Sequence, residues 1–113
     1  MSFKDKHSLE NRTREASKIR SKYPDRIPVI VEPSAKCTFA IERRKYLIPN
    51  DLTVGQLSYV IRKRINMEAD QALYFFVNNT IPPTGGLVSQ LYHEHKDEDG
   101  FLYIIFNGES TFG

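Results

Sequence analysis

The stretch KYLIPNDLTVGQLSYVIRKRI, residues 45–65, contains a strand and a helix joined by a short polar turn. Residues 46–48 form an apolar run that stops at Pro49, which predicts a strand ending there. Thr53, followed three residues later by Gln56, has the pattern of a capping box. Apolar residues then recur at helical spacing, which predicts a long helix beginning after Thr53. These positions are Val54, Leu57, Ile61 and Ile65.

The segments on either side supply further helices and strands. Residues 26–32 are short and β-branched, which predicts a strand. Residues 3–21 are polar with a narrow apolar stripe, which predicts one or two surface helices that end before Pro24. ALYFFV, residues 72–77, and FLYIIF, residues 101–106, are continuous apolar runs of strand length. Such runs are typical of strands buried on both faces, so we expect these, or at least the second, to be central in a sheet.

A turn and a short helix connect these two runs. Residues 78–86, NNTIPPTGG, have turn chemistry, and residues 87–95 predict a short helix with Leu87, Leu91 and, as a further candidate, Tyr92 turned inward. The order is therefore helices, two strands, a long helix, a strand, a short helix and a last strand. A first hairpin crossed by a helix, with later strands returning beside it, is the order of the ubiquitin-like β-grasp, an α+β fold.

Composition and length indicate a single folded domain. The chain has 113 residues, of which 40% are apolar and 12% aromatic, as in ordinary globular proteins. Cys37 is the only cysteine, so the chain can form neither an internal disulfide nor a cysteine-based zinc site, which fits the reducing cytosol. No apolar run approaches the roughly 20 residues that span a bilayer, and no signal-peptide core follows Met1. Membrane attachment would therefore need another device.

The charges are unevenly distributed along the chain. Residues 1–66 carry 15 Lys and Arg against 7 Asp and Glu, whereas residues 67–113 carry one Lys against 7 acids. This asymmetry favours a basic face that meets acidic peptides, anionic lipid or nucleic acid, although a solvated basic surface without a partner gives the same pattern. No nucleic-acid-binding module or interleaved aromatic pattern accompanies the basic residues 62–64, so we expect no nucleic-acid partner.

Residues that could carry catalysis or bind a metal lack the required spacing. Cys37 and the histidines His7, His93 and His95 have no local signature of a nucleophile and its base. HEHKDED, residues 93–99, has metal-ligand types, but its two histidines face different ways on a helix and its acids lack the pattern of a calcium loop. PPTGG lacks the spacing of a phosphate-binding loop. We therefore expect no metal, no cofactor and no enzyme activity.

Five longer stretches resemble one known family. KIRSKYPDRIPVIVE, RRKYLIPNDLTVGQL, VIRKRI, FFVNNTIPPT and LYHEHKDEDGFLYI are similar to the autophagy-related ubiquitin-like modifiers, the family of the GABA receptor-associated protein. The resemblance implies a β-grasp with a four-stranded mixed sheet, a crossing helix and two N-terminal helices. It further implies one domain over 1–113, with a helical extension at 3–21, a core at 26–106 and a flexible conjugation tail at 107–113.

The same resemblance implies conjugation through the end of the chain. Gly113 would be adenylated by an activating enzyme, passed as a thioester through conjugating enzymes and joined to phosphatidylethanolamine. Phe112 would be read by a processing cysteine protease, and whether cleavage exposes Gly113 stays open. A glycine carboxylate has no Cβ to obstruct attack. The protein is then expected in the cytoplasm and, when conjugated, on autophagosomes or other vesicles.

Recognition of short peptides is the second implied function. Cargo receptors with an aromatic-x-x-aliphatic motif would add a strand to the edge around residues 45–48. Acids beside the motif would contact Arg26, Arg43 and Arg64. The implied aromatic pocket comprises Glu15, Ile19, Pro28, Ile30, Lys45, Leu47 and Phe101. The implied aliphatic pocket comprises Tyr46, Ile48, Pro49, Leu52, Leu57, Val60 and Ile61.

Two departures from the family pattern leave the exact peptide preference open. The segment 33–44 looks about one residue shorter than in the animal member, and Leu57 stands where an aromatic residue often lies. Two other classes of function remain as alternatives. One is a non-conjugated module whose basic helices bind tubulin, anionic lipid or nucleic acid, and the other is a small hydrolase that uses Cys37.

Overall fold

Two helices precede the sheet, α1 (Phe3–Lys6) and α2 (Leu9–Lys22). The computed structural model describes residues 1–109. Ser2 forms a capping box at the start of α1, and the Ser8 side chain accepts a hydrogen bond from a backbone N–H in the first turn of α2. A serine cap satisfies N–H groups that have no partner within the helix. The second cap explains why this segment forms two helices instead of one.

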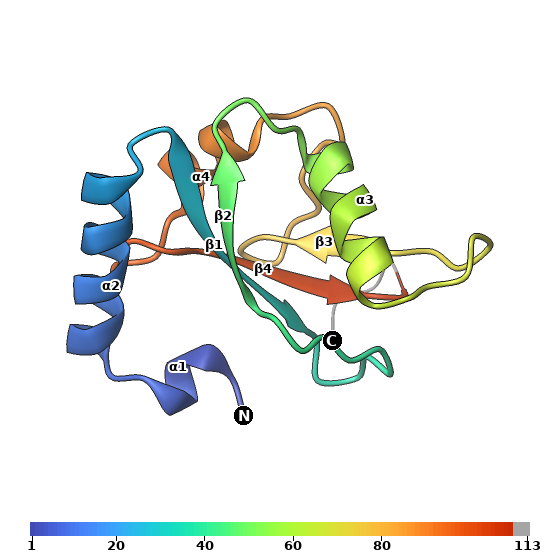
Figure 1. The fold of residues 1–113 in the computed structure, drawn as a ribbon. Coiled ribbons are helices and arrows are strands. Elements are labelled where there is room, and N and C mark those ends of the chain that lie inside the picture. The colour runs from blue at the N-terminus through green and yellow to red at the C-terminus, as the bar shows by residue number, and fades with distance from the viewer. Residues whose placement is uncertain (110–113) are drawn as a thin grey trace.

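Four strands form one mixed sheet in the order β2-β1-β4-β3 (Figure 1). β1 pairs antiparallel with β2 and parallel with β4, and β3 pairs antiparallel with β4. The strands are β1 (Arg26–Pro33), β2 (Lys45–Pro49), β3 (Tyr74–Phe76) and β4 (Leu102–Asn107). The predicted four-stranded mixed sheet is confirmed, and β2 and β3 are its two edges.

The two continuous apolar runs have different positions in this sheet. The second run forms β4 between β1 and β3, which confirms its predicted central place. The first run forms only the three-residue edge strand β3, so a central place for it is wrong. Phe75 and Phe76 are nevertheless buried, and Phe75 belongs to the same core cluster as Val88 and Leu91. A continuous apolar run thus indicates that a strand is buried. It does not indicate a central position, because neighbouring elements can also bury an edge strand.

The predicted capping box starts the helix that crosses the sheet, α3 (Val54–Arg64). The Thr53 hydroxyl accepts from the Gln56 N–H at 3.1 Å, and the Gln56 side chain accepts from the Thr53 N–H at 2.9 Å. In α4 (Val88–His95), Leu87 is the N-cap residue and its side chain is 40% exposed, so the prediction that it turns inward is wrong. Leu87 lies before the first helical turn, and Val88 occupies the buried position instead.

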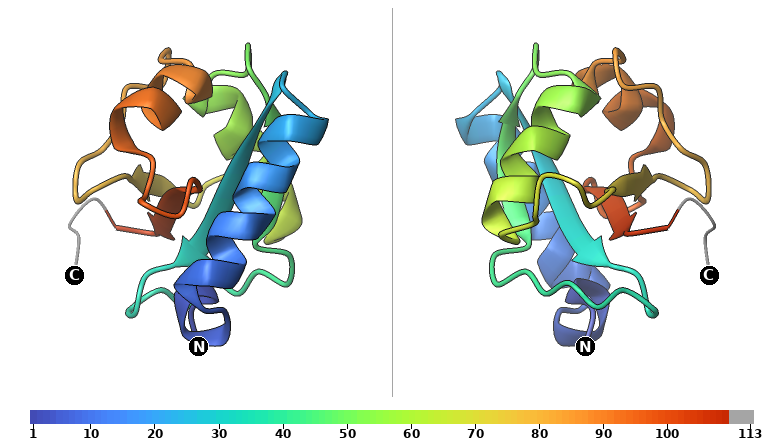
Figure 2. Two further views of the ribbon diagram at one scale, coloured as in Figure 1. Left: turned by 90° about the vertical axis from the view of Figure 1, so that its left-hand side faces the viewer. Right: turned by 90° about the vertical axis from the view of Figure 1, so that its right-hand side faces the viewer.

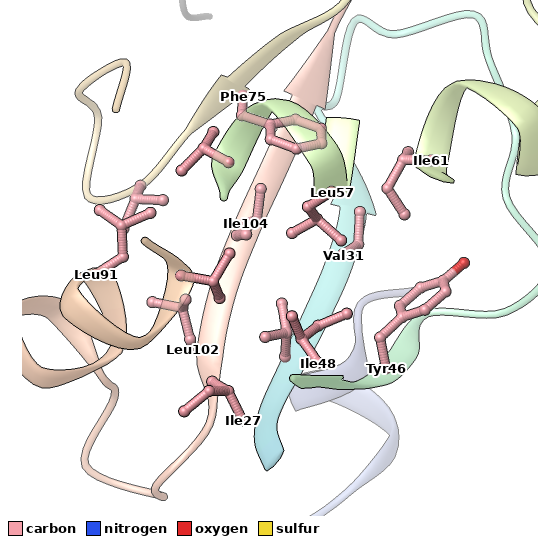
Figure 3. Packing of buried hydrophobic residues seen from close by; sticks show 14 of the residues in the cluster. Ile27, Val31, Tyr46, Ile48, Leu57, Ile61, Phe75, Leu91, Leu102 and Ile104 are labelled. Atoms are coloured by element: carbon pink, nitrogen blue, oxygen red, sulfur yellow. The ribbon is translucent and has the colours of Figure 1, made fainter. Parts of the chain in front are cut away.

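The two faces of the sheet have separate apolar clusters. The larger cluster lies on the face with α3 and α4, and Figure 3 shows Leu57, Ile61 and Leu91 directed toward strand residues. The smaller cluster includes residues of α1 and α2, and Figure 2 shows these helices on the other side of the sheet from α3 and α4. It joins Phe3, Ala16, Ile30 and Phe101. Tyr46 and Ile48 of β2 belong to the larger cluster, and Ile30 of the smaller cluster lies opposite Lys45 of β2 in the sheet register.

Candidate functional site

The outer edge of β2 presents backbone groups that take no part in the sheet ladder. Pro28 of β1 lies opposite Leu47, and proline has no N–H for the ladder. Because bonded pairs alternate in an antiparallel ladder, the bonds to β1 fall at Tyr46 and Ile48. The backbone groups of Lys45 and Leu47 therefore point away from the sheet. An edge of this kind can pair with an additional strand.

The side chain of Arg43 already uses one of these groups. Its Nε donates a hydrogen bond of 3.0 Å to the carbonyl oxygen of Lys45. The guanidinium carbon lies 5.5 Å from the centre of the Tyr46 ring. A strand that pairs with this carbonyl shares it with Arg43 or displaces the guanidinium, since a carbonyl oxygen can accept two hydrogen bonds.

A hollow of about 270 Å³ lies between α2 and β2, and we call it the α2 pocket. It brings together four residues of the predicted aromatic pocket: Glu15, Ile19, Lys45 and Leu47. Lys45 and Glu15 form an ion pair that joins β2 to α2. Sequence reasoning missed three further lining residues, namely Lys18, Lys22 and Tyr23, and Arg43, which was predicted as an acid contact, also lines the pocket. The α2 pocket thus has an apolar lining and a predominantly basic rim.

The other three predicted aromatic-pocket residues lie below this surface. Pro28, Ile30 and Phe101 are buried, and the latter two belong to the small cluster under the N-terminal helices. They do not line the α2 pocket. Ile30 and Phe101 support its wall, because α2 packs on them through Ala16 and Ile19.

Most of the predicted aliphatic pocket lies on the α3 face of β2, whereas Pro49 shares the strand face of Lys45 and Leu47. Four of its residues are core side chains that are at most 6% exposed: Tyr46, Ile48, Leu57 and Ile61. Pro49 and Leu52 are half-buried, and Val60 is 38% exposed. The surface that a ligand can touch is therefore concentrated in these last three residues, near the C-terminal end of β2.

The predicted acid-contacting arginines lie at opposite ends of β2. Arg26 is exposed and opposite Pro49 in the sheet register. Arg43 and Arg64 border a hollow of about 460 Å³ beside Tyr46, which we call the Tyr46 hollow. Burial raises the pKa of Tyr46, and the nearby Arg64 and Arg43 oppose that rise. The structure thus brings two of the three arginines together.

A buried ion pair fixes α2 to the sheet. Arg12 Nε donates to an Asp99 carboxylate oxygen at 2.8 Å, and the Tyr103 hydroxyl donates to the same oxygen at 2.6 Å. The other oxygen accepts from the Phe101 N–H at 2.8 Å. Burial, followed by the hydrogen bond to Asp99, raises the pKa of Tyr103. Sequence reasoning missed this pair, because 87 positions separate its members and no local pattern joins them.

A second buried carboxylate connects α1 to the chain entering β2. Glu32 accepts from the Phe3 N–H at 2.8 Å and from Arg44 at 2.6 Å. Both carboxylates, Asp99 and Glu32, are less than 9% exposed. The two N-terminal helices are thus held by polar contacts as well as by the small apolar cluster.

The other predicted candidates lie away from β2 or outside the described residues. Cys37 is half-buried against the main cluster, and His95 Nδ1 lies 3.0 Å from the Asn78 amide nitrogen. Within residues 1–109, no group of three or more His, Cys, Asp or Glu is arranged to hold a metal ion. In the same range, no helix is long and apolar enough to cross a membrane. Phe112 and Gly113 lie outside the described residues.

A mixed sheet in the order β2-β1-β4-β3, crossed by α3, defines a protein of the ubiquitin-like class, here extended by two N-terminal helices. The family model described as "Autophagy protein Atg8 ubiquitin like" matches residues 11–113. The chain therefore belongs to the Atg8 family of autophagy-related ubiquitin-like proteins, which confirms the family and the fold expected from the sequence.

Relatives and solved structures agree with this assignment. Autophagy-related protein 8d of Arabidopsis thaliana is 58% identical over 113 residues, covering 99% of this chain and 94% of its own. Autophagy-related protein 8 of Emericella nidulans is 57% identical, covering 98% and 95%. The crystal structure of Trypanosoma brucei ATG8 has a TM-score of 0.92 at 42% identity, covering 100% and 98%. Plasmodium falciparum Atg8, solved with an Atg3 peptide from the same organism, has a TM-score of 0.91 at 41% identity, covering 99% of each chain.

Proposed function

We propose that this protein is a ubiquitin-like modifier that is joined through Gly113 to phosphatidylethanolamine and acts in autophagosome formation. The observation that carries the proposal is the family match, which extends to Gly113. The Atg3 peptide bound to the Plasmodium relative supports enzymes of the conjugation system as partners. The protein is then a substrate of activating, conjugating and processing enzymes and is not itself a catalyst.

The chemistry of the bond fits the residue type. Activation by ATP forms an acyl adenylate, a cysteine thiolate displaces AMP to give a thioester, and the lipid amine displaces the thiolate to give an amide. Glycine offers the least steric hindrance to each attack because it has no Cβ. Phosphatidylethanolamine brings two acyl chains, and two chains anchor a protein where one chain gives only marginal binding. A protease that reads Phe112 and cuts this amide returns the protein to the cytoplasm.

We further propose that the conjugated protein binds cargo receptors through the edge of β2. Residues three apart on an extended strand point to opposite faces. The α2 pocket lies on one face of β2, and the half-buried Leu52 and the exposed Val60 of α3 lie on the other. An aromatic-x-x-aliphatic peptide paired with β2 can therefore reach both surfaces with its two anchors.

The direction of the peptide follows from where the two surfaces lie along β2. The α2 pocket includes Arg43, Lys45 and Leu47, toward the start of the strand, whereas Pro49 and Leu52 lie at its end. A peptide whose aromatic residue comes first then runs parallel to β2. Two buried anchors contribute about 2 to 3 kcal/mol each, which together with strand pairing corresponds to micromolar binding. Such affinity suits a reversible adaptor.

A reconstituted conjugation reaction tests the proposal. The intact protein is incubated with ATP, activating and conjugating enzymes of the Atg8 family, and liposomes that contain phosphatidylethanolamine. We expect a lipid adduct that requires ATP and is absent with phosphatidylcholine liposomes or after deletion of Gly113. The proposal is wrong if the intact protein gives no adduct, or if the deletion variant gives the same adduct.

A further inference from the structure

Gly108 lies where the chain leaves β4, between two loops. β1 runs parallel to β4 and β3 runs antiparallel to it, so the segment after β1 and the segment before β3 both lie at the end of β4 (Figure 1). The first of these loops, residues 34–44, contributes Phe39, and the second, residues 65–73, contributes Ala72. A Cβ on Gly108 would lie 3.2 Å from Phe39 Cε2 and 3.9 Å from the Ala72 carbonyl oxygen. We call this passage between Phe39 and Ala72 the exit collar.

The Phe39 side of the exit collar is held by the rest of the domain. Phe39 is half-buried and packs against the main apolar cluster, so its ring has little freedom to yield. The Ser34 N–H donates to the Phe106 carbonyl oxygen at 2.9 Å, which ties the start of this loop to β4. A contact of 3.2 Å to a Cβ is shorter than ordinary van der Waals contact. A side chain on Gly108 therefore has to push the Phe39 ring away from the cluster.

A side-chain hydrogen bond fixes the direction of the chain inside the exit collar. The Gly108 N–H donates to Asn107 Oδ1 at 2.9 Å, and Asn107 is 5% exposed. Asn107 is the last residue of β4 and lies opposite Tyr74 of β3, so the sheet holds the chain up to the collar. Residues 109–113 follow, and five extended residues span about 17 Å. An enzyme that acts on Gly113 therefore has to be reached from this fixed point.

We propose that Gly108 and Phe39 set the direction in which the chain continues from β4, which makes Gly108 a positioning residue for activation and transfer of the Gly113 carboxyl. The inference rests on the proposed conjugation through Gly113. An enzyme that binds the domain and the end of the chain together needs both in one arrangement, and a fixed starting direction lowers the entropy cost of reaching it. Glycine is needed at 108 for space and not for its backbone angles, since Gly100 is the glycine with a positive φ among the described residues.

The rate of thioester formation tests the exit collar. The protein is incubated with ATP and an activating enzyme of the Atg8 family, whose cysteine thiolate displaces AMP from the Gly113 adenylate. Rates over a range of protein concentrations separate the maximal rate from the half-saturating concentration. We expect Gly108→Val to lower the maximal rate about fivefold and to change the half-saturating concentration less than about twofold, because the surface by which the domain docks is unaltered. Gly85→Val is the matched control and should keep the full rate, because a Cβ on Gly85 meets nothing within 4 Å.

A compensating pair of substitutions assigns the effect to the collar. Phe39→Ala removes the ring that the valine would meet, so adding it to Gly108→Val should recover at least about half of the unaltered maximal rate. If the enzyme instead contacts residue 108 directly, the loss stays in the double variant. Urea unfolding of each variant shows that it is folded under the assay conditions, so that a lower rate does not reflect less folded protein. If Gly108→Val does not fold, Gly108→Ala replaces it, with an expected loss of about twofold.

The outcomes separate the exit collar from the function on which it rests. The inference is wrong if Gly108→Val, or Gly108→Ala in its place, reacts at the unaltered rate, or if Gly85→Val loses as much. It is also wrong if Phe39→Ala does not restore the rate, or if the half-saturating concentration alone rises, because residue 108 then belongs to the docking surface. If the unaltered protein forms no thioester with ATP and the enzyme, conjugation through Gly113 is itself wrong.

Discussion

Asp99→Asn tests the buried ion pair that holds α2 on the sheet. The substitution keeps the size of the side chain and removes its charge. Asp99 is 1% exposed and accepts from Arg12, Tyr103 and the Phe101 N–H. An asparagine has one acceptor oxygen, and its NH2 group replaces the second. This NH2 group must then face a hydrogen-bond donor that the aspartate accepted from. The Arg12 guanidinium also loses its carboxylate partner in a buried place.

The expected loss follows from this geometry. Removing one member of a buried ion pair costs about 3 to 5 kcal/mol, because the remaining charge stays uncompensated. We take the lower end, about 3 kcal/mol, because the asparagine oxygen retains part of the hydrogen bonding. For a domain of this size, that corresponds to a fall in midpoint temperature of roughly 10 °C. The loss is a large part of the about 5 to 15 kcal/mol that stabilises a typical domain.

Urea unfolding followed by circular dichroism measures the loss, with Asp97→Asn as the matched control. Asp97 pairs with Lys4, whose side chain is 46% exposed, so this control should lose less than about 1 kcal/mol. The slope of free energy against urea should stay the same in both variants. A loss for Asp99→Asn no larger than for Asp97→Asn would refute the reasoning that the buried pair fixes α2.

Three further predictions follow from other contacts. Gly100 has φ of +92°, and a Cβ there would lie 3.1 Å from the Ala16 Cβ. Gly100→Ala should therefore lower the free energy of unfolding, measured in urea, by about 2 kcal/mol. An unchanged urea midpoint would contradict this. Leu47→Asp places a charge in the α2 pocket and should weaken a motif peptide at least about tenfold by calorimetry, since it removes an apolar contact; unchanged affinity contradicts it. Burial tends to raise the pKa of Asp97, but hydrogen bonds from Lys4 and the backbone N–H of Asp99 hold it below its ordinary value. Its stabilisation is therefore present at pH 7 and lost as pH falls below about 4, so the difference between the unaltered protein and Asp97→Asn should shrink between pH 7 and pH 3; a constant difference contradicts this.

Local signals in the sequence predicted most of the elements. The capping box at Thr53 and the apolar spacing after it gave the start and buried face of α3, because both depend on residues within one or two turns. The strand before Pro49 was predicted for a similar reason. The edge position of β3 was not predicted. An edge strand that other elements cover on both faces has the same continuous apolar run as a central strand. Leu87 was misplaced by one residue at a helix start, where spacing alone does not fix the boundary.

The candidate site was only partly predictable for a different reason. The resemblance named Ile19, Lys45 and Leu47, and the structure brings them together in the α2 pocket. The pair between Arg12 and Asp99 depends on a tertiary contact between distant segments, for which a single sequence holds no signal. The proposed role of Gly113 rests on the family match, since that residue lies outside the described part of the structure.

Mass spectrometry of the conjugated protein tests the central proposal most directly. The reconstituted reaction is run with one defined phosphatidylethanolamine, and the product is digested and sequenced. We predict that the C-terminal peptide gains the mass of the lipid less one water and that fragmentation assigns it to the Gly113 carboxyl. Lipid on Cys37 or on a lysine, or an unmodified C-terminal peptide from the membrane-bound protein, would contradict the account.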